Sequence, residues 1–155
     1  MQVAVALIIR QRTFGNYCQE SVFVFYCQIR ESIVATIEDI CEKSFGAIIQ
    51  VLSTNSGGTG FFVGENLIFT NSHVVKSLND IRIKDHSKNE WQAKAIYRDP
   101  KMDICILGSE VPCGTSLSLL TDEDQVKIGQ EVVAVGHPLS LDYSVSRGDC
   151  EFQGA

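Results

Sequence analysis

Residues 70–75 read Thr70-Asn71-Ser72-His73-Val74-Val75 and place an imidazole where an apolar run ends and a turn begins. Two short apolar runs precede His73, at 60–63 and 67–69, and the polar segment 64–66 separates them. Short apolar runs divided by turn-forming residues are typical of a β-hairpin. The pattern therefore predicts a hairpin with His73 directly after its second strand.

A carboxylate occupies a comparable place further along the chain. Asp103 precedes the apolar run 104–107 and lies thirty positions after His73. A carboxylate that orients an imidazole fixes its tautomer and stabilises the imidazolium, so the pair acts as a general base. His73 and Asp103 are the candidate catalytic residues. Taken singly, each has an ordinary interpretation, as a structural imidazole and as a turn or helix-cap carboxylate.

Five ordered blocks carry a resemblance to a known family. They are Gly58-Thr59-Gly60-Phe61, the 70–75 stretch, Asp99 to Leu107, Gly129 to Leu139, and Ser144 to Gly148. One block would be weak support, because a motif is a hypothesis until its context agrees. Together, from about Ser44 to Gly148, they resemble the HtrA (Deg) group of trypsin-like serine proteases.

The periodicity of the chain predicts its secondary structure. Apolar residues recur at helical spacing across 31–43, which predicts a short amphipathic helix packed on the outside of the domain. After it, short β-type runs separated by turn residues predict a small closed antiparallel barrel, because closure removes sheet edges. The six expected strands are 47–52, 60–63, 67–70, 81–84, 92–98 and 104–107.

The resemblance implies an all-β fold of the chymotrypsin/trypsin-like class, with the first six-stranded barrel complete and only the opening strands of the second. We expect residues 29–108 to form the helix and first barrel, 109–128 to connect the barrels, and 129–155 to begin the second. Strands at 132–136 and 143–147 are then expected to form a hairpin without further partners, and a lone hairpin is marginally stable. Residues 1–28 form a leader whose role stays open between an added hairpin, a flexible segment and an oligomer contact.

The resemblance also implies a function. Members of the family hydrolyse peptide bonds through an acyl-enzyme, with His73 as base and Asp103 as its orienting carboxylate. Their nucleophile stands in a Gly-Asn-Ser-Gly-Gly segment after the counterpart of Ser144 to Gly148, and no such segment occurs in the 155 residues. We therefore expect an incomplete serine endopeptidase that is inactive alone. The alternative is a non-catalytic peptide- or protein-binding barrel.

Composition restricts the partners. The net charge is −6, so no basic stripe argues for nucleic acid. The six cysteines are widely and irregularly spaced without a Cys-x-x-Cys pair, which favours free thiols in a reducing compartment over disulfides or a metal site. The glycines at 57–60 are not followed by Gly-Lys-Ser/Thr, so they do not form a phosphate cradle. No cofactor or metal is expected.

The N-terminus does not predict targeting. The apolar run within residues 1–9 has no basic segment before it and ends at Arg10, which is too short for a membrane span and wrongly flanked for a signal peptide. A cytoplasmic location is favoured on that ground. The expected partner is a polypeptide substrate or unfolded protein, and the resembled family suggests a homo-oligomer.

Overall fold

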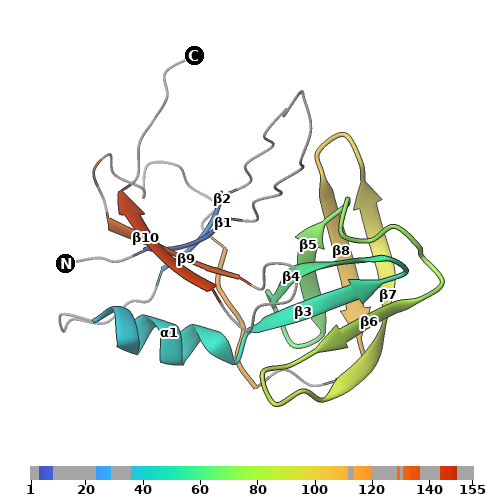
Figure 1. The fold of residues 1–155 in the computed structure, drawn as a ribbon, viewed down its shortest axis with the longest axis horizontal. Helices are drawn as coiled ribbons and strands as arrows, with labels where there is room; N and C mark the ends of the chain where they lie inside the picture. Colours follow the sequence, from blue (N-terminus) through green and yellow to red (C-terminus); the bar gives the residue numbers. More distant parts are fainter. Residues whose placement is uncertain are drawn as a thin grey trace.

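Six short strands close into an antiparallel barrel in the order β3-β4-β5-β8-β7-β6. The computed structural model describes residues 4–8, 24–28, 36–111, 114–119, 129, 131–136 and 144–149. Figure 1 shows the barrel on the right of the view. Its strands are β3 (Ile48–Ser53), β4 (Ser56–Phe62), β5 (Leu67–Asn71), β6 (Ile81–Lys84), β7 (Glu90–Asp99) and β8 (Ile104–Ser109). The predicted all-β barrel is confirmed, and so is the β4–β5 hairpin before His73.

Side chains that point into the barrel form one apolar cluster. Alternation along β8 buries Cys105 and Leu107 completely, because successive residues of a strand face opposite sides of the sheet. A register shift between Ala95 and Tyr97 in β7 is a β-bulge, which leaves Ile96 and Tyr97 on the surface. The cluster contains Ile49, Val51, Phe62, Ile68, Val74, Val75, Ile81, Ile83, Ala93, Cys105 and Leu107.

The helix α1 (Ile37–Phe45) begins later than the predicted residue 31. Thr36 is the N-cap, in an extended conformation, and forms a capping box with Asp39. The Asp39 amide donates to Oγ1 of Thr36 at 3.2 Å, and the Thr36 amide donates to Oδ2 of Asp39 at 2.8 Å. The hydrogen bonds that the amide and the hydroxyl of Thr36 donate to the Asp39 carboxylate lower the pKa of that carboxyl. The cap fixes the start of the helix, whereas periodicity alone gives only its face.

A second sheet of four strands has the order β10-β9-β1-β2. Its strands are β1 (Ala4–Ile8), β2 (Val24–Gln28), β9 (Glu131–Gly136) and β10 (Ser144–Asp149). β9 pairs with β10 in an antiparallel register and with β1 in a parallel one, and β1 pairs with β2. The expectation of a C-terminal hairpin without further partners is therefore wrong, because a strand from the leader covers the second edge of β9.

α1 and β9 pack against the outside of the barrel (Figure 1). Val133 and Val135 of β9 are 0% and 1% exposed, so β9 belongs to the core. The cluster that joins the three parts contains Ile40, Cys41, Ala47, Ile48, Phe61, Leu117, Val133 and Val135. The predicted outer position of the helix is confirmed.

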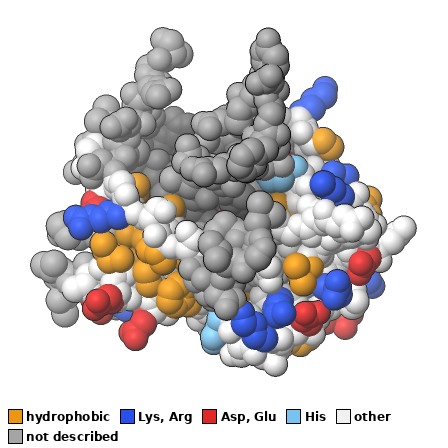
Figure 2. Space-filling model, in the orientation of Figure 1, with side chains coloured by type: hydrophobic (Ala, Val, Ile, Leu, Met, Phe, Trp, Pro, Cys, Tyr) orange, Lys and Arg blue, Asp and Glu red, His pale blue; other side chains and the backbone are white. Residues whose placement is uncertain are grey.

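The surface carries both signs of charge. On the face shown in Figure 2, Lys and Arg side chains lie among Asp and Glu side chains over the described part of the barrel. Cys41 and Cys105 are free and buried, and the other four cysteines lie outside the residues whose side chains the structure describes. Among the described residues, no helix is both long and apolar enough to cross a membrane.

Burial of β9 predicts how the second sheet contributes to stability. Val133→Ala removes two methyl groups from a fully buried site, so we expect a loss of about 2 kcal/mol in the free energy of unfolding. Val145→Ala in β10 is the matched control, because that side chain is 44% exposed and little apolar contact is lost. Urea denaturation measures both. Equal, small effects would show that β9 does not share the cooperative core.

Candidate active site

His73 lies in a short turn that directly follows β5. The amide of Val74 donates to the carbonyl of Asn71, and the amide of Val75 donates to the carbonyl of Ser72, both at 3.2 Å. Val74 and Val75 are buried in the barrel cluster and anchor the turn from its C-terminal side. The imidazole is therefore carried by a turn that is held at both ends.

Glycine at position 58 allows this turn to approach β4. A methyl group placed on Gly58 would lie 2.6 Å from Cγ2 of Val74, closer than van der Waals contact permits. The Val74 side chain therefore occupies the space that a Cβ at position 58 would need. Any larger residue at 58 would displace the turn that carries His73.

Asp103 stands at the start of β8 with a φ of 53°, in the left-handed region that most residues avoid. The preceding turn is fixed by Asp99, whose Oδ1 accepts from the amides of Lys101 at 2.8 Å and Met102 at 3.1 Å. The carbonyl of Asp103 accepts from the amide of Ser72 at 3.1 Å. β5 and β8 are neighbours in the barrel, so the two strand ends meet.

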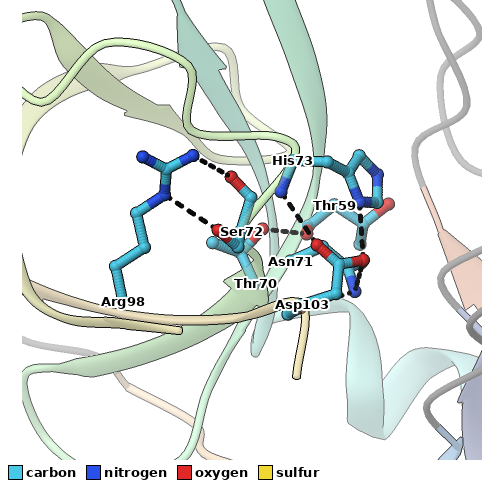
Figure 3. Close-up of polar contacts among 7 residues, drawn as sticks. All are labelled: Thr59, Thr70, Asn71, Ser72, His73, Arg98 and Asp103. Atoms are coloured by element: carbon cyan, nitrogen blue, oxygen red, sulfur yellow. Dashed lines mark hydrogen bonds and ion pairs between the residues drawn. The ribbon is translucent and has the colours of Figure 1, made fainter. Parts of the chain in front are cut away.

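The side chains of His73 and Asp103 meet as the sequence predicted (Figure 3). Nδ1 of His73 lies 2.7 Å from Oδ2 of Asp103, inside the expected hydrogen-bonding range. The backbone amide of His73 donates to Oδ1 at 2.9 Å, so both carboxylate oxygens bind the same residue. The His73 side chain is 30% exposed and that of Asp103 16%, which leaves the imidazole accessible and its partner shielded.

Asn71 adds a further support for the carboxylate. Its Nδ2 donates to the carbonyl and to Oδ2 of Asp103, both at 3.1 Å. Asn71 is 1% exposed, and a buried amide with two acceptors on one residue restricts the rotation of that residue. The backbone and side chain of Asp103 are thus both held by residues 71–73.

Arg98 contacts the same turn from its other side, and the sequence analysis did not identify it. Nε of Arg98 donates to Oγ of Ser72 at 2.8 Å, and Nη2 donates to the carbonyl of Ser72 at 3.1 Å. Figure 3 shows Arg98 on one side of Ser72 and the His73–Asp103 pair on the other. A cationic residue directly before Asp99 was the available signal, but its reach to Ser72 depends on the order of strands.

Two buried thiols, those of Cys105 and Cys41, are further potentially reactive groups among the described residues. Burial raises the pKa of the Cys105 thiol, and the nearby Arg98 charge opposes that effect. Burial likewise raises the pKa of Cys41. Within the part of the chain that the structure describes, no group of three or more His, Cys, Asp or Glu side chains could hold a metal ion. The titratable groups that the structure brings together at this site are the imidazole of His73 and the carboxylate of Asp103.

Comparison with known proteins identifies the family that the chain resembles in sequence. Residues 58–152 match the family described as "Trypsin-like peptidase domain". The protein named "Probable periplasmic serine endoprotease DegP-like" of Pseudomonas putida (strain GB-1) is 33% identical over 100 residues, which is 63% of this chain and 20% of that protein. The protein of the same name from Halomonas elongata is 36% identical over 92 residues, which is 59% of this chain and 19% of that protein. The chain spans about a fifth of these relatives.

Solved structures share the fold. The serine endoprotease from Yersinia pestis superposes with a TM-score of 0.66 at 19% identity, over 79% of this chain and 47% of that one. The Rv3671c protease, in an inactive form, gives a TM-score of 0.63 at 22% identity, over 70% of this chain and 53% of that one. At these identities the likeness concerns the arrangement of the strands.

The geometry predicts the tautomer of the His73 imidazole. A proton on Nδ1 donates to the ionised Asp103, so we expect the Nδ1–H tautomer in the native chain. Asp103→Asn tests this cleanly, because asparagine tolerates the left-handed backbone while removing the charge. The population of the Nδ1–H form should then fall, as long-range ¹H–¹⁵N spectra would report.

The exposed His86 provides an internal reference in the same spectra, since it should be unaffected by the substitution. An unchanged His73 tautomer in Asp103→Asn would show that the carboxylate does not set the proton position.

Proposed function

This chain belongs to the trypsin-like peptidase domain family, as its resemblance predicted, and we propose that it supplies the His–Asp part of a serine endopeptidase triad. The observation that carries the proposal is the 2.7 Å approach of Nδ1 of His73 to Oδ2 of Asp103. The amide of His73 on Oδ1 further fixes the carboxylate in this orientation. A pair with this geometry leaves Nε2 of the imidazole to exchange protons with a substrate.

In the proposed reaction, Nε2 of His73 takes the proton of a serine hydroxyl as its oxygen attacks the scissile carbonyl. The same nitrogen then returns the proton to the leaving amine, and a water molecule releases the acyl group by the reverse sequence. Asp103 stays ionised and stabilises the imidazolium. The three donors on its carboxylate come from Asn71 and His73, and they hold it in place during both steps.

The nucleophile and the oxyanion donors are assigned to polypeptide outside these 155 residues. No Gly-Asn-Ser-Gly-Gly segment occurs in the sequence. Loss of a triad member lowers the rate by about four to six orders of magnitude. We therefore propose that the 155 residues alone are inactive and that the complete catalytic unit acts on polypeptide, as the names of the relatives indicate for those proteins.

The alternative, a non-catalytic binding barrel, is less well supported. A binding surface does not require a shielded carboxylate aligned with a solvent-accessible imidazole, yet five hydrogen bonds to Asp103 maintain that alignment. The retained geometry favours a proton-transfer role.

Activity of the isolated chain is the first test. We expect the purified 155 residues to hydrolyse no unfolded casein above background and to give no covalent label with a fluorophosphonate, because an activated serine is not identified among them. Ser140, Ser144 and Ser146 lack the glycine neighbours of a sharp nucleophile turn. Labelling of any of these three would contradict the assignment.

A chimera tests the pair of His73 and Asp103, here called the dyad. Residues 44–148 of this chain would replace the matching segment of the Pseudomonas putida relative, whose remaining chain would be the source of the serine. We expect casein hydrolysis by the chimera and a loss of about four to six orders of magnitude on His73→Ala. The parent protease is the positive control. A chimera that unfolds as cooperatively as the parent but hydrolyses nothing would refute the proposed role of His73 and Asp103.

A further inference from the structure

A row of three residues runs across the barrel beneath the His73 turn. Arg98 of β7 lies opposite Cys105 of β8, and Cys105 lies opposite Thr70 of β5. Residues that are directly paired in neighbouring strands have side chains on the same face of the sheet. Arg98 therefore starts on the same face as the buried Cys105, and although Arg98 is exposed as a residue, its guanidinium reaches Ser72, the second residue after Thr70.

The contact that matters most is on a backbone group. The carbonyl of Ser72 and the amide of His73 belong to one planar peptide unit. Nη2 of Arg98 donates to the carbonyl oxygen of that unit at 3.1 Å, while its N–H donates to Oδ1 of Asp103 at 2.9 Å. A guanidinium and a carboxylate thus hold opposite ends of the same peptide group. Each charge polarises the group in the direction that strengthens the other hydrogen bond.

We propose that Arg98 is a positioning residue, which orients His73 and Asp103 through the peptide unit between Ser72 and His73. The inference rests on the proposed catalytic role of His73 and adds a residue to it. Arg98 does not contact the imidazole. It fixes the plane of the peptide from which the His73 side chain projects, and through it the N–H that holds Asp103.

Arginine suits this task better than lysine. Its planar fork presents Nε and Nη2 to two acceptors on one residue, Oγ and the carbonyl of Ser72. Ser72 is 2% exposed with the fork in place, and without the fork its carbonyl keeps only the amide of Val75 as a donor among the hydrogen bonds named here. A lysine carries a single ammonium, which does not reproduce the fork. We therefore expect Arg98→Lys to order His73 better than Arg98→Ala does but less well than the native arginine.

The test uses the full chain and two readouts at His73. In Arg98→Ala, hydrogen exchange of the His73 amide should accelerate by about tenfold or more, because two charge-assisted hydrogen bonds that order the turn are lost. The Nδ1–H tautomer should also lose population in ¹⁵N spectra. Core amides of β8 provide the reference for global stability. Arg82→Ala is the matched control, because it removes an arginine whose ion pair, to Glu90 at 3.1 Å, lies on the surface.

A double-mutant cycle locates the effect. Ser72→Ala removes only the Oγ acceptor and keeps the carbonyl, so it should perturb His73 less than Arg98→Ala does. In the Arg98→Ala background, Ser72→Ala should add little, since the shared contact is already absent. Ser72→Ala and Arg98→Lys also keep the test decisive if Arg98→Ala does not fold.

The outcomes separate this inference from the proposed function. If the hydrogen exchange of the His73 amide and the tautomer of its imidazole are both native in Arg98→Ala and in Arg98→Lys, the positioning role is wrong. The assignment of the His73–Asp103 pair would then still stand. A wild-type chain without the Nδ1–H tautomer would instead contradict the proposed dyad, whatever the effect of Arg98 on the His73 amide.

Discussion

The bond network around Asp103 is the constraint on which the site depends. Its carbonyl and both carboxylate oxygens accept hydrogen bonds from residues 71–73, so one residue at the start of β8 fixes the end of β5. β5 and β8 are adjacent, and their pairing from Leu67↔Gly108 to Asn71↔Ile104 brings the two ends together. Strand pairing in the barrel thus places His73 and Asp103 near one another. The hydrogen bonds to Asp103 then fix how the two side chains are oriented.

This geometry requires an unfavourable backbone conformation. A residue at φ of 53° costs on the order of 1–3 kcal/mol unless its surroundings fix it. Here the Asp99 turn on one side and the Asn71 and Ser72 donors on the other supply that fixation. With this backbone conformation, the carboxylate of Asp103 points toward the end of β5, where it contacts His73. The other described non-glycine residues with positive φ, Asn55 and Lys88, lie in turns that join consecutive strands, whereas Asp103 lies beside His73.

Sequence patterns predicted the parts of this arrangement that depend on local rules. Short apolar runs separated by turn residues predicted the barrel strands, and His73 and Asp103 were identified because each adjoins the end of such a run. The reach of Arg98 was not predictable in this way, since it requires knowing that β8 lies between β7 and β5. The start of α1 depended on the Thr36 cap, and the partner of β9 was a strand from a leader for which no pattern specified a neighbour.

The dyad is assembled entirely from the closed barrel, and the second sheet meets the same barrel a short distance away. A methyl group placed on Gly136, at the end of β9, would lie 3.1 Å from Oγ1 of Thr59. The carbonyl of Thr59 in turn accepts from Oγ1 of Thr70 at 2.8 Å, three residues before His73. The end of β9 thus touches β4 at the residue that is bonded to β5. β4 and β5 belong to the closed barrel that carries His73 and Asp103, whereas the second sheet lies against that barrel through the buried cluster of Val133 and Val135 with Ile48 and Phe61.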